Sequence, residues 1–127
     1  MKLLCFSDIH NSKSGLAKLE RLLAENEYDL IVFAGDATEL GPKEFLEKLV
    51  QTLLENKVKA VAVTGNRDFP QFEDFFAEKK LSIHGKKAKI GGFEFVGLGG
   101  SNPTPFNCPN TRSEEEIYGI LEPLVGE

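Results

Sequence analysis

The sequence predicts an α/β fold in which a parallel β-α-β-α-β core is followed by an antiparallel meander. Short apolar runs alternate with segments of helical periodicity in the first part of the chain, which is typical of parallel strands joined by right-handed crossovers. Closely spaced apolar runs separated by glycine turns come next. The chain has 127 residues, of which 41% are hydrophobic, so residues 1–127 are expected to form a single domain.

The three strands of the parallel core are predicted over residues 3–6, 30–34 and 58–63. Each is a short, continuous apolar run, and such runs are expected in strands that are buried on both faces of a sheet. Cys5 lies inside the first run, so we expect it to be a small buried hydrophobic residue.

Helices are predicted after each of these strands. The first has Ser12 or Ser14 available as its N-cap, and the second is expected to carry Pro42 in its first turn. Apolar residues at helical spacing define the apolar stripes of these helices: Leu16, Leu19, Leu22 and Leu23, then Phe45, Leu46, Leu49, Val50, Leu53 and Leu54, then Phe72, Phe75 and Phe76.

The second part of the chain has shorter elements. Strands are predicted over residues 81–84, 87–90 and 93–98, with glycine turns between them, and we expect them to form the antiparallel meander. A proline-containing loop over residues 99–111 follows. Residues 113–116 have the Ser-x-x-Glu pattern of a capping box, which predicts a last short helix.

Charge and composition exclude several classes of protein. The 15 Lys and Arg residues against 20 Asp and Glu residues give a net charge of −5, which argues against a general binder of nucleic acids or anionic membranes. No apolar run approaches the about 18–20 residues of a membrane span. The polar pair Ser7-Asp8 comes too early for a signal peptide, so a cytoplasmic location is expected.

Polar side chains follow each strand of the predicted parallel core. Asp8 and His10 follow the first strand, Asp36 the second and Asn66 the third. Functional groups of an open parallel sheet gather beyond the carboxyl ends of its strands, so these four side chains are expected to converge. Two carboxylates, an imidazole and a carboxamide suit Mn²⁺, Fe or Zn²⁺. The glycine before Asp36 and before Asn66 would let the backbone turn sharply there.

These clusters resemble motifs of a known family. Asp8-Ile9-His10, Gly35-Asp36 and Gly65-Asn66, with Asp68 two residues later, resemble the D-x-H, G-D and G-N-H-D/E motifs of the calcineurin-like metallophosphoesterase superfamily. The stretch 93–105 is similar to Icc-like members of that superfamily. The motifs are specific in combination and weak singly.

The resemblance implies roles for the clustered residues. Asp8 and His10 would bind one divalent metal ion, Asp36 would bridge two ions, and Asn66 would bind the second. Mn²⁺ is the ion we expect, with Fe or Zn²⁺ as alternatives and with one or two ions bound. Two ions about 3.5–4 Å apart can hold a hydroxide that attacks a phosphomonoester or phosphodiester. Phosphorylated small molecules or phosphodiesters are therefore the expected substrates.

The residues after Asn66 complete the predicted catalytic set of Asn66, Arg67 and Asp68. Arg67 stands where the family usually has a histidine. Arginine can bind phosphate in a bidentate manner, so Arg67 is also the predicted phosphate-binding residue, but it cannot donate a proton. The alternative function is a catalytically degenerate relative that acts as a metal-binding, phosphate-binding or interaction module, and a purely structural domain is the third possibility.

The family fold is a pair of stacked sheets flanked by helices, an αββα sandwich. The distal lone histidine and G-H-x-H motifs of the family are not found here, so the chain is expected to correspond to the N-terminal half of that fold. Half a sandwich would expose a sheet edge and an apolar face, which predicts a homo-oligomer.

Other nucleotide and hydrolase signatures are missing. The Gly97-x-Gly99 pair lacks the rest of a dinucleotide-binding fingerprint, and Pro103 would block the helix that should follow it. The phosphate-loop pattern G-x-x-x-x-G-K-[S/T] and the G-x-S-x-G nucleophile elbow are also absent.

Overall fold

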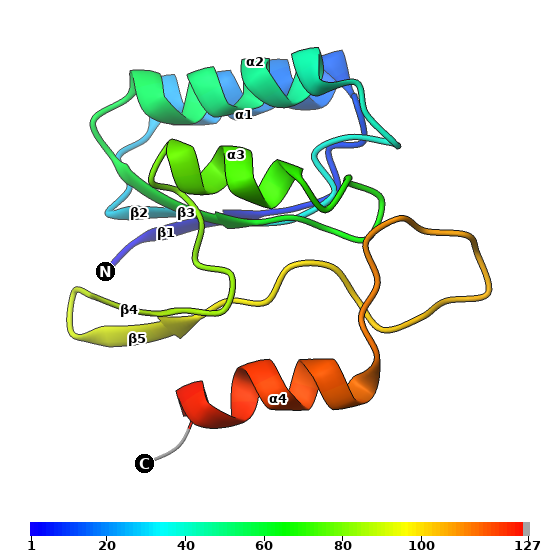
Figure 1. Ribbon diagram of the computed structural model, residues 1–127. Helices are drawn as coiled ribbons and strands as arrows, with labels where there is room; N and C mark the ends of the chain where they lie inside the picture. The colour runs from blue at the N-terminus through cyan, green and yellow to red at the C-terminus, as the bar shows by residue number, and fades with distance from the viewer. Residues whose placement is uncertain (126–127) are drawn as a thin grey trace.

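The computed structural model describes residues 1–125 and has an α/β architecture with helices on one face of a parallel sheet (Figure 1). Helices α1, α2 and α3 lie on one side of this sheet, whereas a β-hairpin and helix α4 lie on the other. The elements are β1 (Leu3–Phe6), α1 (Lys13–Glu25), β2 (Leu30–Ala34), α2 (Lys43–Glu55), β3 (Lys59–Val63), α3 (Phe72–Glu78), β4 (Lys87–Ile90), β5 (Phe93–Val96) and α4 (Glu114–Val125).

The parallel sheet has the strand order β1-β2-β3, with β2 in the centre. Leu4 pairs with Ile31 and Phe6 with Phe33, and all four side chains face the core beneath the helices. The rings of Phe6 and Phe33 lie 4.8 Å apart between centroids. Phe76 of α3 meets Phe33 edge to face at 6.2 Å. The predicted parallel core is therefore confirmed.

The first two helices begin at the residues that the sequence marks as helix starts, a serine for α1 and a proline for α2. Ser12 is the N-cap of α1, because its Oγ accepts a hydrogen bond of 2.9 Å from the backbone N–H of Gly15. Ser14 lies inside the helix. Pro42 is the N-cap residue of α2, one position before the first turn that we predicted for it. The apolar stripe of α2 is buried at Phe45, Leu46, Leu49, Val50 and Leu53.

Strand β1 differs from the prediction, because it is not buried on both faces. It is an edge strand, and Leu3 and Cys5 are exposed on the side opposite the helices. Side chains alternate between the faces of a strand, so Leu4 and Phe6 reach the core while Leu3 and Cys5 do not. The expectation that Cys5 is buried is therefore wrong, since nothing in the described part of the chain covers that face at Cys5.

The second part of the chain forms an antiparallel pair, as predicted. Strands β4 and β5 pair from Lys87↔Val96 to Ile90↔Phe93. Residues 81–84, however, make single parallel bridges instead of a third meander strand: Ser82 bridges to Ala62 of β3 and His84 to Gly97. Residues 81–84 lie alongside β3, because the backbone N–H of Ala62 donates a hydrogen bond to the carbonyl of Leu81 at 2.8 Å.

Helix α4 confirms the capping box. The hydroxyl of Ser113 accepts a hydrogen bond of 3.1 Å from the backbone N–H of Glu116, and the Glu116 carboxylate accepts one from the backbone N–H of Ser113 at 3.3 Å. No helix within residues 1–125 is both long and apolar enough to cross a membrane.

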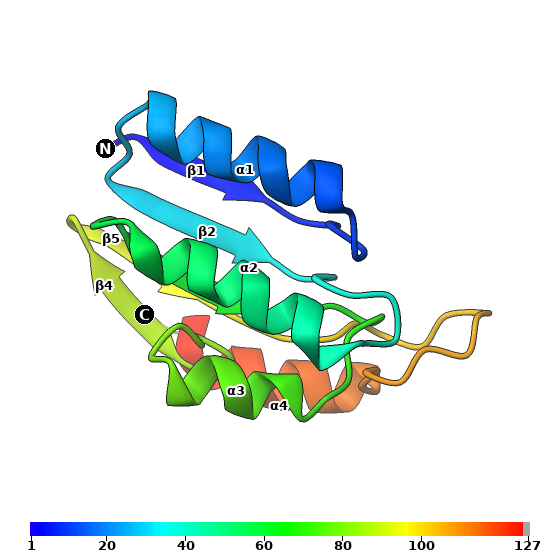
Figure 2. The same ribbon diagram turned by 90° about the horizontal axis from the view of Figure 1, so that it is seen from above.

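The loop over residues 99–111 projects at the end of the sheet toward which the strand arrows of β1 and β2 point (Figure 2). It is connected to the end of β3, because the buried Asn110 donates hydrogen bonds to Thr64 Oγ1 at 2.7 Å and to the carbonyl of Gly65 at 3.0 Å. The fold thus brings three strand ends and this loop together.

Candidate metal centre

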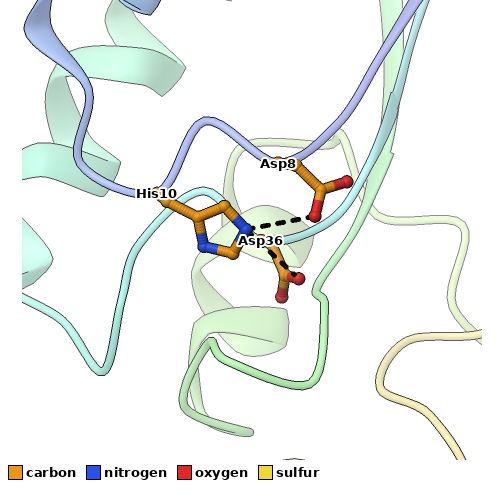
Figure 3. A group of neighbouring side chains, drawn as sticks. All are labelled: Asp8, His10 and Asp36. Carbon is orange, nitrogen blue, oxygen red and sulfur yellow. Dashed lines mark hydrogen bonds and ion pairs between the residues drawn. The ribbon is translucent and has the colours of Figure 1, made fainter.

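Asp8, His10 and Asp36 turn toward one another at the carboxyl ends of β1 and β2 (Figure 3). One donor atom from each lies within 4.8 Å of the other two. Nε2 of His10 is 3.1 Å from Asp8 Oδ1 and 3.8 Å from Asp36 Oδ2. Two ligands on opposite sides of one transition-metal ion are separated by about 4.2 Å, so the set is compact enough to close on a single ion.

The backbone holds these residues in an uncommon conformation. Asp8, His10 and Asp36 have φ values of 60°, 47° and 60°, in the left-handed region that residues with a Cβ rarely adopt. The backbone N–H of Asp8 donates to the carbonyl of Gly35 at 2.9 Å, and that of His10 to the carbonyl of Asp36 at 3.0 Å. Such strain persists where surrounding contacts maintain it, and it is concentrated at functional sites.

The two glycines before Asp36 and Asn66 have different reasons to be glycine. Gly35 has a φ of 97°, which confirms the sharp turn that we expected. Gly65 instead allows a close approach, since a Cβ at this position would lie 2.0 Å from Oδ1 of Asp36. Any side chain at residue 65 would therefore displace the Asp36 carboxylate.

The charges of the site influence one another. Burial raises the pKa of Asp36, whose side chain is 16% exposed. The hydrogen bond from the hydroxyl of Ser7 lowers the pKa of Asp8, which is more exposed. Burial of His10 opposes its protonation, but the hydrogen bond to Asp8 and the charges of Asp36 and Glu39 outweigh it and raise its pKa. The site therefore favours a positive charge between its carboxylates.

Glu39 joins this group from the loop after β2. Its Oε2 lies 2.9 Å from Nδ1 of His10, yet this buried nitrogen lacks a well-aligned hydrogen bond among the described residues. Glu39 also forms an ion pair with the guanidinium of Arg67. A carboxylate behind the imidazole is the usual support for a histidine whose other nitrogen binds a metal. The surroundings of His10 thus fit a metal ligand.

Asn66 and Arg67 follow β3 and adjoin this group. The backbone N–H of Arg67 donates to Asp36 Oδ1 at 3.0 Å. The amide Nδ2 of Asn66 donates to the hydroxyl of Ser101 at 3.1 Å. Because this bond uses only the N–H side of the amide, the Oδ1 of Asn66 remains chemically suited to a metal ion.

Asp68 lies apart from the group, in the interior. It is 0% exposed, and both carboxylate oxygens accept hydrogen bonds. Oδ1 accepts from the backbone N–H and the hydroxyl of Thr38, both at 2.8 Å, and Oδ2 accepts from the N–H groups of Ala37 at 3.2 Å and Gly65 at 3.0 Å. Through these hydrogen bonds Asp68 links the loop that contains Asp36 to the loop that contains Asn66.

Four residues of the site neighbourhood were missed by the sequence analysis: Ser7, Glu39, Ser101 and Asn110. Ser7 could have been noticed, because it directly precedes Asp8. Glu39, Ser101 and Asn110 lie in irregular loops, where no periodicity indicates which side chains turn inward.

Several known proteins are similar to this chain. A model of the calcineurin-like phosphoesterase family matches residues 1–122. A protein of Methanocaldococcus jannaschii, named Uncharacterized protein MJ1162, is 38% identical over 126 residues, which cover 98% of this chain and 55% of that protein. The chain thus spans about half the length of this relative.

Two solved structures show the same fold. TT1561 of Thermus thermophilus superposes with a TM-score of 0.77 at 17% identity, with 96% of this chain and 60% of that chain covered. A second structure has a TM-score of 0.76 at 21% identity, with 97% and 63% covered. The family match over residues 1–122 and the 38% identity to the archaeal relative show that the chain belongs to the calcineurin-like phosphoesterase family.

Proposed function

We propose that this chain is a metal-dependent phosphoesterase that hydrolyses a phosphomonoester or phosphodiester. The observation that carries the proposal is the convergence of one donor atom each from Asp8, His10 and Asp36 within 4.8 Å. Family membership supports the same reaction class. We assign these three residues as ligands of a divalent ion, with Asn66 as a fourth ligand.

The donor set suits a transition-metal ion, and Mn²⁺ is the ion we propose first, with Fe or Zn²⁺ as alternatives. A bound divalent ion would supply Lewis-acid chemistry, polarising the phosphoryl group and lowering the pKa of water. Oδ2 of Asp36 is 3.8 Å from Nε2 of His10, and its Oδ1 accepts a hydrogen bond from the backbone N–H of Arg67, the residue after Asn66. Asp36 is therefore the carboxylate that we assign to a bridging position if two ions bind.

The residues of the chain would orient the substrate. Arg67 would hold phosphate oxygens and offset their charge, because its guanidinium is planar and permanently charged. Glu39 would hold both Arg67 and His10 in place through its two ion pairs. Asp68, predicted as catalytic, is proposed here as a positioning residue, since its four hydrogen bonds occupy both oxygens.

The second candidate is a relative that binds a metal ion or phosphate without turning over substrate. Arg67 favours it, because arginine cannot protonate a departing alkoxide as a histidine can. The two candidates share metal binding and differ in turnover.

We also propose that the chain self-associates through the exposed sheet face at Leu3 and Cys5. Exposed apolar strand faces at a sheet edge favour association. The cytoplasmic location stays a prediction.

The test is the stoichiometry of Mn²⁺ binding, measured by calorimetry on the whole chain and on Asp36→Asn. We expect the whole chain to bind at least one Mn²⁺ and the variant to lose this binding, because Asp36 supplies a ligand oxygen. Asp74→Asn, a change at an exposed residue in the first turn of α3, is the matched control and should bind like the unmodified chain.

Mn²⁺ binding that ignores Asp36→Asn would overturn the assignment of the metal site. If the site binds Mn²⁺, turnover of phosphomonoesters and phosphodiesters then separates the two candidates. Hydrolysis that depends on Asp36 supports the phosphoesterase, whereas binding without hydrolysis supports the binding module.

A further inference from the structure

A small pocket opens beside the candidate metal centre. It has a volume of about 360 Å³ and is lined by Glu39, Asn66, Arg67, Thr104, Phe106 and Cys108. Ligand pockets start at about 300 Å³, so this one has room for a phosphate group and a single ring. Its lining combines the polar side chains of Glu39, Asn66 and Arg67 with the aromatic ring of Phe106.

Arg67 still has hydrogen-bonding capacity in this pocket. A guanidinium has five N–H bonds. Nε and Nη2 face Glu39, and Nη1 lies 3.6 Å from Sγ of Cys108, so among residues 1–125 one N–H on each Nη has no partner and can bind a ligand. Two such bonds match two oxygens of a phosphate group.

Phe106 is an unusually exposed aromatic residue on a constrained loop. Phe106 is 75% exposed, although a phenyl ring normally packs against apolar neighbours. The turn around it is braced by hydrogen bonds from the hydroxyl of Thr104 and the backbone N–H of Cys108 to its carbonyl, both 3.0 Å. Pro103, Pro105 and Pro109 restrict the loop further. The backbone that carries the exposed ring is therefore preorganised, and less conformational entropy is lost from this loop when a ligand binds.

The chemistry of Arg67 points to the same class of ligand. An arginine cannot protonate a leaving group, so the site suits groups that depart as stable anions. A phenol, with a pKa of about 10, leaves far more readily as its anion than an alkyl alcohol does. In such a hydrolysis the phosphorus–oxygen bond to the ring breaks, water adds its hydroxyl to phosphorus, and the proton of the water passes to solvent while phenolate departs.

We propose that Phe106 is a specificity-determining residue, and that this pocket selects phosphoesters whose leaving group is a single aromatic ring. The ring would stack on Phe106 while Arg67 holds the phosphate. This inference rests on the proposed function and extends it, because neither the metal ligands nor family membership specifies the leaving group.

The test compares two non-hydrolysable probes, phenylphosphonate and methylphosphonate, by calorimetry with the whole chain in the presence of Mn²⁺. We expect phenylphosphonate to bind about fivefold more tightly, since an aromatic pair contributes a preference of this order. Phe106→Ala should bring the ratio of the two affinities close to one and leave methylphosphonate binding unchanged. The variant should fold, because the Phe106 side chain is largely exposed.

Phe93→Ala is the matched control, because Phe93 is also an exposed phenylalanine, 58% exposed, but lies on β5 and does not line the pocket. It should keep the preference for phenylphosphonate. A ratio near one in the unmodified chain, or an unchanged ratio in Phe106→Ala, would overturn this inference and leave the proposed function standing. If neither phosphonate bound in the presence of Mn²⁺, this inference would fail, whereas the Mn²⁺ titration of the same chain decides the proposed function independently.

Discussion

Three aspartates follow the strands of the parallel sheet, and their surroundings give them different chemical properties. The Asp8 side chain is 60% exposed, that of Asp36 is 16% exposed and Asp68 is fully buried. Asp8 and Asp36 both face His10, and the repulsion between the two carboxylates is offset when a cation lies between them. Asp68 faces N–H and O–H donors alone, so it is satisfied without a metal ion.

At the residue scale, we predict that Asp68→Asn lowers the free energy of unfolding by about 2–4 kcal/mol. The amide would turn an N–H group toward backbone donors of Ala37 and Gly65, leaving them unpaired in the interior. Urea denaturation measures the change, with Asp74→Asn on the surface of α3 as the control. Equal stabilities of the two variants would contradict the role we give to the buried carboxylate.

At the scale of single elements, helix α1 starts directly after the metal-ligand loop. The hydroxyl of Ser12 caps the helix two residues after His10, so the helix start and the position of the imidazole are coupled through a short segment. The buried residues of α1, Leu16 and Leu19, then hold the helix against the sheet. The sequence left Ser12 and Ser14 as equal candidates for the cap, and only the structure distinguishes them.

We predict that Ser12→Ala destabilises the protein by about 1 kcal/mol, the usual loss for a removed N-cap. Ser14→Ala should have little effect or stabilise slightly, because alanine is the better residue inside a helix. Thermal or urea unfolding of the two variants gives the comparison. Similar losses in both would show that the cap is shared between the two hydroxyls, which lie 3.1 Å apart.

At the scale of the whole molecule, the two faces of the parallel sheet are covered unequally. Helices α1, α2 and α3 bury Ile31 and Phe33, whereas Cys5 and Ala34 are exposed on the other face, although β4, β5 and α4 lie on that side (Figure 1). Helix α4 has no buried residue, so it adds little cover. This imbalance is the physical basis of the proposed self-association.

We predict that the chain forms a dimer or larger assembly at micromolar concentration, and that Cys5→Lys shifts it toward the monomer. A lysine on this face would have to be desolvated when two copies meet. Ala17→Lys, on the exposed side of α1, is the control and should not change the assembly. Sedimentation velocity measures the outcome, and an unmodified chain that stays monomeric would count against the idea.

Helices and strands were predicted best, because their periodicity depends on residues that are close in the sequence. The stripe of α2 and the capping box of α4 depend on neighbours three or four positions apart, so a single sequence contains the needed information. Residues 81–84 were misassigned because their partners, Ala62 and Gly97, are remote in sequence. The exposure of Cys5 was mispredicted for the same reason, because it depends on which distant segments of the chain cover that face of the sheet.

The order of residues by itself determined the strand–helix alternation and the placement of Asp8, His10, Asp36 and Asn66 after strand ends, because both follow from local pattern. Tertiary structure decided which of the nearby polar groups meet. It placed Glu39 against both His10 and Arg67, buried Asp68 in the interior, and made Phe106 part of the lining of a pocket. These outcomes depend on the conformations of irregular loops at the carboxyl edge of the sheet. Packing and hydrogen bonds between segments that are distant in the sequence determine those conformations.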